Sequence, residues 1–328
     1  MRMIRFGRTN LTVPAVSLGT WGHGGENKSA TGESVGWSGH DDAAAREALI
    51  AAWANGLTHW DTADVYGRGH AEKLIGSVWD DVPRREIILA TKVGWDAGGF
   101  GHYYHPEQIR RQMEASLENL RVDIIDIYYL HHCDFGPEDV YFADALSTML
   151  RLREEGKFRF LGLSDWNLRK IMKFISRVDP DVVQPYRNIC DDDYAASGLR
   201  AWIDEHDLGV AFFSPIKHGL LLGKYDHPQK FPEGDFRRNI PEFGNTESIA
   251  RMKHAAATVA KRFPEHPQPV LHAVVDALLA DAPAGTVLLG QRNARQVEAA
   301  ATIGEPLTRG EAEWVRSVYR GTGEGHQS

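Results

Sequence analysis

Four residues of the sequence belong to types that can together perform acid–base chemistry on a carbonyl group: Asp61, Tyr66, Lys92 and His131. A buried ammonium next to a phenol stabilises the phenolate and lowers the phenol pKa, and a carboxylate keeps that ammonium charged. We expect Asp61 to pair with Lys92 and Lys92 to tune Tyr66. Tyr66 can then protonate a carbonyl oxygen, which His131 can orient by a second hydrogen bond.

Such a set reduces a carbonyl only if hydride is supplied, and no side chain can supply it. A nicotinamide cofactor is therefore required. Taken singly, each residue has an ordinary explanation, because an Asp after a strand often caps a turn and a Lys is usually solvated. The catalytic interpretation is favoured by their concurrence at or just beyond the ends of three successive apolar runs, where all four would face one opening.

The elements that must position these residues are short apolar runs alternating with helical patterns. Most runs are continuous and rich in Val, Ile or Leu, which is typical of parallel strands covered by helices. The predicted strands span 15–18, 58–61, 87–92, 124–130, 158–164, 182–184, 210–214 and 286–290.

The intervening patterns predict helices with recognisable ends. Asp41 or Asp42 can cap the first, and Pro106 can begin the second. Eight strands with helices between them, in 328 residues, favour a (β/α)8 TIM barrel. A doubly wound open sheet is the alternative, but residues 19–24 do not match its glycine fingerprint. The predicted helices span 41–54, 106–120, 143–155, 168–177, 196–206 and 294–301.

We expect residues 1–328 to form one barrel domain. Residues 1–14 should contain a hairpin that plugs the end of the barrel opposite the active site, and residues 321–328 should form a frayed tail. Two long loops, 22–40 and about 216–246, should build the opening at the C-terminal ends of the strands.

Composition excludes several classes of protein. The 45 acidic and 37 basic residues give a net charge of -8, which argues against nucleic-acid binding and against docking on an anionic membrane. No apolar run could span a bilayer, and no signal peptide is visible. Two cysteines are too few for a disulfide framework. These features predict a cytoplasmic protein.

The motifs around the four residues resemble those of the aldo-keto reductases. The segment from Asp61 to Glu72 is similar to the family signature around its Asp and Tyr. Thr91-Lys92 resembles the lysine motif, and 126–131 resembles the histidine motif. The likeness covers nearly the whole chain and is strongest to bacterial general-stress and aldose-dehydrogenase-like members.

The resemblance implies a cofactor lying across the barrel mouth, with NADP(H) favoured over NAD(H) because Arg292 offers a planar fork for a 2′-phosphate. Asp165 stands where the family usually has Asn. The residues implied in cofactor binding are Gly19, Thr20, Trp21, Asp61, Ser164, Asp165, Gln184, Phe213, Ser214, Ile216, Gly219, Leu220, Gly290, Arg292 and Gln296.

We expect Trp21, Trp95, His132 and Trp166 to line the substrate pocket, where flat apolar walls suit aromatic aldehydes and the CH faces of sugars. The predicted partner is thus a small carbonyl compound or a sugar, interconverted with an alcohol or lactone. Two alternatives stay open: a nicotinamide-sensing regulatory subunit of the same fold, and a metal-dependent barrel hydrolase. No metal is expected, because adjacent residues of a strand point to opposite faces and the neighbouring histidines 131 and 132 could not both bind one ion.

Overall fold

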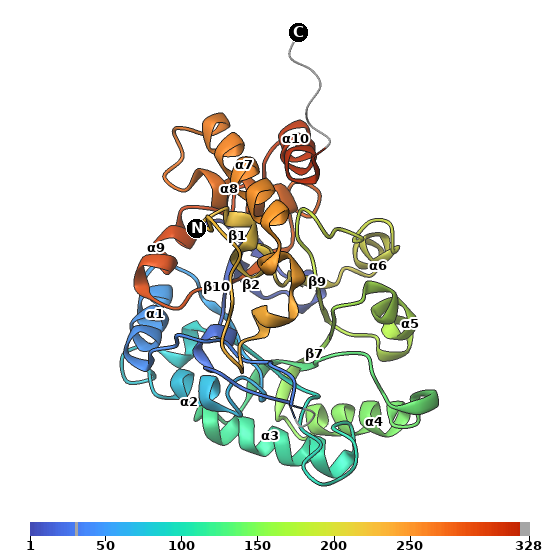
Figure 1. Ribbon diagram of the computed structural model, residues 1–328. Coiled ribbons are helices and arrows are strands. Elements are labelled where there is room, and N and C mark those ends of the chain that lie inside the picture. The colour runs from blue at the N-terminus through green and yellow to red at the C-terminus, as the bar shows by residue number, and fades with distance from the viewer. Residues whose placement is uncertain (30–31, 322–328) are drawn as a thin grey trace.

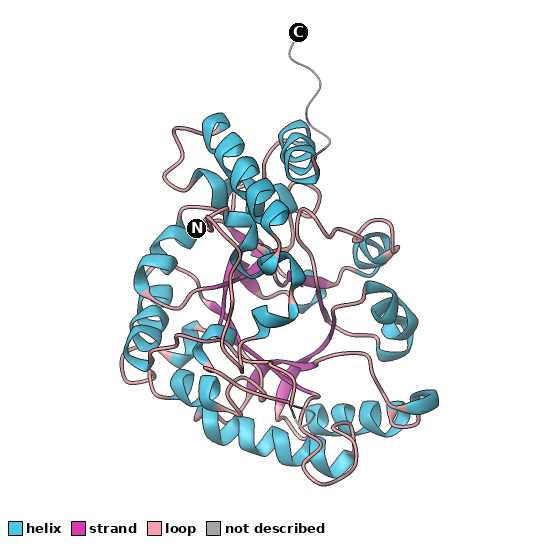
Figure 2. Ribbon diagram, viewed as in Figure 1, coloured by secondary structure: helices cyan, strands magenta, loops and turns pink. Residues whose placement is uncertain are grey.

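Eight parallel strands form a closed barrel at the centre of this computed structural model, which describes residues 1–29 and 32–321. Each strand pairs with the next along the chain, and the last pairs with the first. Figure 2 shows the ring of strands with helices around it, which confirms the predicted (β/α)8 barrel. The strands are β3 (Val16–Gly19), β4 (His59–Asp61), β5 (Ile88–Val93), β6 (Ile125–Leu130), β7 (Phe158–Asp165), β8 (Val182–Pro185), β9 (Gly209–Phe212) and β10 (Thr286–Gly290).

The helices cover the outside of the barrel, so the strands are buried on both faces (Figure 1). This double burial explains why the strands are continuous apolar runs. Asp41 caps α1 by accepting from the backbone N–H of Ala44, as predicted. The helices are α1 (Asp42–Ala54), α2 (His70–Gly76), α3 (Pro106–Leu120), α4 (Phe142–Glu154), α5 (Leu168–Val178), α6 (Leu199–His206), α7 (Thr246–Arg262), α8 (Pro269–Leu279), α9 (Ala294–Ala301) and α10 (Arg309–Arg320).

Two features differ from the predicted helices. Helix α6 begins at Leu199 instead of 196, because Gly198 takes a left-handed conformation (φ 85°) that interrupts the helix. Helices α2, α7, α8 and α10 are additional to the predicted elements. No helix among the described residues is long and apolar enough to cross a bilayer.

An antiparallel hairpin, β1 (Met3–Arg5) with β2 (Thr12–Pro14), precedes the barrel. Its connection packs against the starting ends of the strands. Phe6 is fully buried with its ring 5.6 Å from that of His59. Gly7 has φ 52°, and a Cβ there would lie 2.3 Å from the backbone nitrogen of Gly209. The hairpin therefore closes the end of the barrel opposite the C-terminal ends of the strands, as predicted.

The two long loops interlock over the other end of the barrel. Gly36 and Asp235 form an isolated parallel bridge. Ser38 donates to Asp235 Oδ2 from its backbone nitrogen (2.9 Å) and from its hydroxyl (2.5 Å). Asn27 donates its backbone N–H to the carbonyl of Gly234. The first loop thus holds the second across the opening. The predicted frayed tail lies outside the described residues, apart from Gly321 at the end of α10.

Candidate active site

The four residues singled out in the sequence converge at the C-terminal end of the barrel. Asp61 ends β4, Lys92 lies on β5, and His131 follows β6 directly. Tyr66 lies in the turn between β4 and α2. Lys92 Nζ donates to Asp61 Oδ1 at 2.5 Å and to the carbonyl of Thr62 at 2.6 Å, and it lies 3.5 Å from the Tyr66 hydroxyl oxygen.

The Asp61–Lys92 ion pair is deeply buried, with side-chain exposures of 5% and 1%. Burial raises the pKa of Asp61 and lowers that of Lys92, and their mutual attraction opposes both shifts. Gln184 Nε2 adds a hydrogen bond of 2.8 Å to Asp61 Oδ2. The pair therefore satisfies the conditions under which a buried ion pair stays charged, namely close contact and further hydrogen bonds to the same groups.

The expectation that Lys92 would bring the pKa of Tyr66 below its ordinary value is wrong for this structure, because the net shift is upward. Burial raises the pKa of the Tyr66 phenol well above its ordinary value, and the carboxylates of Asp61 and Asp64 raise it further. The ammonium does not outweigh them, since its charge is matched by Asp61 at shorter distance. Tyr66 therefore carries its proton at neutral pH, which is the form that a proton donor needs.

His131 lies beside the phenol, with its ring centroid 6.0 Å from that of Tyr66 and the two planes at 78°. Burial, followed by the charge of Lys92, lowers the pKa of His131 well below its ordinary value. A neutral imidazole retains one N–H. His131 can therefore donate a hydrogen bond to an uncharged oxygen without competing with Tyr66 as the proton donor.

A further carboxyl, Asp64, is buried behind this group. Its Oδ2 accepts from Gln112 Nε2 at 2.9 Å, while Oδ1 has no partner among the described residues. Burial, with the nearby charge of Glu72, raises the pKa of Asp64 to about 7. Protonation of this carboxyl relieves the cost of an unpartnered buried charge.

We expect the Asp64→Asn variant to gain stability relative to the wild type as pH rises. The pKa of Asp64 is higher in the folded than in the unfolded wild type. Protonation of Asp64 therefore stabilises the folded wild type at low pH, and this stabilisation is lost as pH rises through 7. From pH 5 to 8 the gain should reach about 2 kcal/mol. Urea unfolding of both proteins at the two pH values measures it. An equal stability difference at both pH values would contradict a titrating Asp64.

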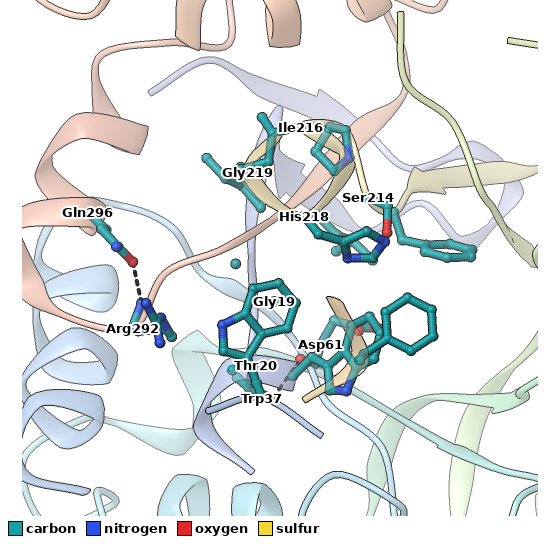
Figure 3. A pocket seen from close by; sticks show the side chains of 18 of the residues that line it. Gly19, Thr20, Trp37, Asp61, Ser214, Ile216, His218, Gly219, Arg292 and Gln296 are labelled. Carbon is teal, nitrogen blue, oxygen red and sulfur yellow. Dashed lines mark hydrogen bonds between the residues drawn. The ribbon is translucent and has the colours of Figure 1, made fainter. Parts of the chain in front are cut away.

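A cavity of about 640 Å³ opens beside this cluster, and Asp61, Tyr66 and His131 line it. Figure 3 shows Arg292 and Gln296 together on one side of the cavity, with Ser214 and His218 on the other side. Of the residues predicted for cofactor binding, those that line the cavity are Gly19, Thr20, Trp21, Asp61, Ser164, Gln184, Phe213, Ser214, Ile216, Gly219, Gly290, Arg292 and Gln296.

Three predicted binding residues do not line this cavity. Asp165 accepts hydrogen bonds from the backbone nitrogens of Cys133 and Asn167, both at 2.7 Å, and so fixes the loop after β6. Leu220 is packed in the core. His132 is predicted in the substrate pocket, but it is buried behind Trp95, with its Nε2 bonded to the carbonyl of Gly94. The other three pocket residues, Trp21, Trp95 and Trp166, line the cavity.

Arg292 lies at the far end of the cavity, just before α9. Its Nη1 donates to the carbonyls of Ser38 (3.0 Å) and Gly39 (3.3 Å), and Gln296 accepts from its backbone nitrogen. No carboxylate forms an ion pair with Arg292 within the described residues. The group therefore provides a positive charge without a protein counter-ion, as an anion site requires.

The structure adds residues that the sequence analysis missed. Trp37, His218, Phe236 and Arg237 line the same cavity, and all four come from the two interlocked loops. The only sequence signal was the aromatic content of those loops. Their place in the pocket depends on the contact between segments about 200 residues apart.

The comparisons with known proteins agree with this geometry. The model of the Aldo/keto reductase family matches residues 15–320. The chain is 30% identical to aldo-keto reductase yakc [NADP(+)] of Schizosaccharomyces pombe over 71% of this chain and 67% of that protein. It is 28% identical to the NADH-specific methylglyoxal reductase of Escherichia coli over 68% and 70%.

A solved structure, a glycerol dehydrogenase from Gluconobacter oxydans, superposes with a TM-score of 0.79 at 25% identity, covering 99% of this chain and 97% of that one. The family match spans nearly all of the barrel, and the shared fold places the same strand ends around one opening. The chain therefore belongs to the aldo/keto reductase family and is an oxidoreductase.

Proposed function

We propose that this chain, as one barrel domain, is an NADP(H)-dependent oxidoreductase that interconverts aldehydes, ketones or sugar hemiacetals with alcohols or lactones. The observation that carries this proposal is the buried Asp61–Lys92 pair held against Tyr66 and His131 at the wall of the cavity. A nicotinamide, when bound, supplies or accepts the hydride. The protein has to orient the carbonyl and move one proton.

In the reductive direction, the Tyr66 hydroxyl gives its proton to the carbonyl oxygen as the carbonyl carbon gains hydride. His131 donates an N–H to the same oxygen and so fixes its direction. Lys92 stabilises the phenolate that remains, and Asp61 keeps Lys92 charged. The phenolate then regains a proton from solvent, and the reverse sequence oxidises an alcohol.

The residues around the cavity fit a nicotinamide dinucleotide. Gln184 and Ser164 place polar groups at the catalytic end, and Phe213 presents an aromatic ring there. At the other end, Arg292 has no protein carboxylate to neutralise it among the described residues, and Gln296 lies on the first turn of α9. That charge supports NADP(H) rather than NAD(H), since a 2′-phosphate would supply the missing counter-ion.

The test of the whole proposal is oxidation of NADPH, and separately of NADH, in the presence of a panel of aldehydes. We expect aldehyde-dependent NADPH oxidation that does not require added metal and resists a chelator. Absence of turnover with every aldehyde and every alcohol would refute the proposal. Retained cofactor binding without turnover would instead favour a nicotinamide-sensing subunit.

We expect the Arg292→Gln variant to bind NADPH about 10- to 100-fold more weakly, while NADH binding changes by less than about threefold. Glutamine can still donate to the loop carbonyls but lacks the charge. Quenching of tryptophan fluorescence measures both affinities. The control is Arg309→Gln, an exposed arginine on α10 that pairs with Glu313. Equal losses for the two cofactors would contradict contact with the 2′-phosphate.

A further inference from the structure

Five rings form what we call the aromatic box, made of Trp21, Trp37, Trp166, His218 and Phe236. All five line the cavity. The centroid of Trp21 lies 4.9 Å from that of Phe236 and 5.6 Å from that of His218, and the His218 and Phe236 centroids are 5.1 Å apart. Trp21 also stacks on the catalytic Tyr66 at 6.0 Å and 18°. The box is therefore continuous with the catalytic end of the cavity.

Three polar members of the box make no side-chain hydrogen bond within the described residues: Trp37, whose indole N–H is also fully buried, Trp166 and His218. His218 is the one of the three that can accept as well as donate a hydrogen bond. It is 8% exposed, and neither ring nitrogen bonds to another group within the described part of the chain. Figure 3 shows its imidazole pointing into the pocket. Burial lowers the pKa of His218 to about 3, so the ring is neutral and presents one donor and one acceptor. The hydroxyl of a ligand can supply the hydrogen-bond partner that this ring lacks.

The backbone around His218 is held in a costly conformation that directs the ring inward. Lys217, His218 and Gly219 have φ angles of 45°, 57° and 91°. Two consecutive non-glycine residues in the left-handed region are strained and persist only where neighbouring structure imposes this conformation. Lys217 supplies that support through ion pairs with Asp191 (3.1 Å) and Glu242 (2.8 Å).

The five rings of the box carry no charge. Lys224 and Arg292 also line the cavity and form no ion pair within the described part of the chain. Arg237 lines the same cavity, but its Nε and Nη2 donate to Asp235 Oδ1 and Oδ2 at 2.9 and 2.6 Å. Its guanidinium is also held between the rings of Trp37 (4.5 Å) and Phe231 (4.1 Å). A substrate carboxylate or phosphate would therefore find no available cation in the box and would lose its hydration there.

We propose that His218 is a specificity-determining residue and that the aromatic box binds the ring of a neutral aromatic aldehyde bearing a ring hydroxyl. The flat walls match an aromatic ring, and His218 hydrogen-bonds the hydroxyl away from the reacting carbonyl. An aldopyranose fits less well, because it carries several hydroxyls and His218 is the one ring of the five that can accept a hydrogen bond. The inference rests on the proposed function and narrows its substrate class.

The test compares kcat/KM for benzaldehyde, 3-hydroxybenzaldehyde, 4-hydroxybenzaldehyde, 3-carboxybenzaldehyde and an aldopyranose at about pH 6, where phenols are neutral. For the wild type, we expect at least one hydroxybenzaldehyde to exceed benzaldehyde about tenfold, and the carboxylate and the sugar to be the poorest. In His218→Phe, the hydroxyl preference should fall to about twofold or less. His218→Gln, which keeps a donor and an acceptor, should restore part of it.

Binding provides a second readout that does not depend on turnover. Quenching of tryptophan fluorescence by 3- and 4-hydroxybenzyl alcohol, compared with benzyl alcohol, should show the same preference and the same loss in His218→Phe. His254→Phe, at an exposed histidine on α7, is the matched control and should leave both readouts unchanged.

The two proposals fail in different ways. No turnover with any substrate would refute the proposed function. In that case the preference for hydroxybenzyl alcohols over benzyl alcohol in the binding measurement would still test the role of His218. Turnover without a hydroxyl preference in either readout, a preference that survives in His218→Phe, or a preference for the carboxylate or the sugar would each overturn the assignment of His218.

Discussion

The Tyr66→Phe variant should reduce aldehydes about a thousandfold more slowly than the wild type while binding NADPH with near-normal affinity. The substitution removes the proton donor and little else, because the ring remains. That ring stacks on Trp21 and lies 5.1 Å from Lys92 Nζ, and both contacts are independent of the hydroxyl. Steady-state NADPH oxidation and a fluorescence titration with the cofactor measure the two effects separately.

Tyr141→Phe is the matched control. Tyr141 lies outside the cavity, stacks on His102 and makes no hydrogen bond through its hydroxyl within the described residues. We expect it to leave turnover unchanged. The pKa of Tyr66 is raised well above its ordinary value. Tyr66 therefore stays protonated near neutral pH, and the reduction rate of the wild type should not fall there through loss of its proton. Near-normal turnover of Tyr66→Phe would exclude Tyr66 as the acid.

The barrel could be predicted because its strands carry a strong local signal. Each is buried on both faces, so the sequence shows short continuous apolar runs, and the observed bounds differ from the predicted ones by at most two residues. Helix α10 also carries a readable signal, the capping box of Thr308 and Glu311. Helix α2 is harder to detect, since it has seven residues and follows Gly69 in a left-handed conformation.

The convergence of Asp61, Tyr66, Lys92 and His131 at one end of the barrel could be predicted for a different reason. In a parallel barrel the C-terminal ends of neighbouring strands must meet, so residue types at those ends identify a site without knowledge of the loops. The aromatic box could not be predicted from the sequence in this way. Trp37 and Phe236 reach the cavity because Gly36 and Asp235 pair across the opening, and this contact between distant segments has no local signature.

The direction of the Tyr66 pKa shift could not be predicted from the sequence either. Sequence motifs place one ammonium and one carboxylate near the phenol, and from these alone a lowered pKa is a reasonable expectation. The structure adds Asp64, which belongs to the same motif but has no assigned role in it, and buries the whole group. The balance of charge and desolvation depends on distances that only the folded chain defines.

The Lys92→Met variant should lose turnover as severely as Tyr66→Phe and, unlike it, should also lose stability. Removing the ammonium leaves Asp61 as an uncompensated buried carboxylate, which costs about 3–5 kcal/mol. Gln184 still donates to Asp61 Oδ2, but the bonds from Lys92 to Asp61 and Thr62 are lost. Urea unfolding and NADPH oxidation measure the two losses.

A second substitution separates the structural role of the ion pair from its catalytic role. In Asp61→Asn/Lys92→Met no charge remains to be compensated, and the oxygen of the introduced amide can still accept from Gln184. Much of the lost stability should return, while turnover stays low because nothing stabilises the phenolate of Tyr66.

The pH dependence of stability provides a further check. In Lys92→Met the folded pKa of Asp61 rises further above its unfolded value, so this variant should lose more stability between pH 5 and 8 than the double variant. If the double variant were no more stable than Lys92→Met at pH 8, the loss would come from packing around Lys92 and not from the unpaired charge of Asp61.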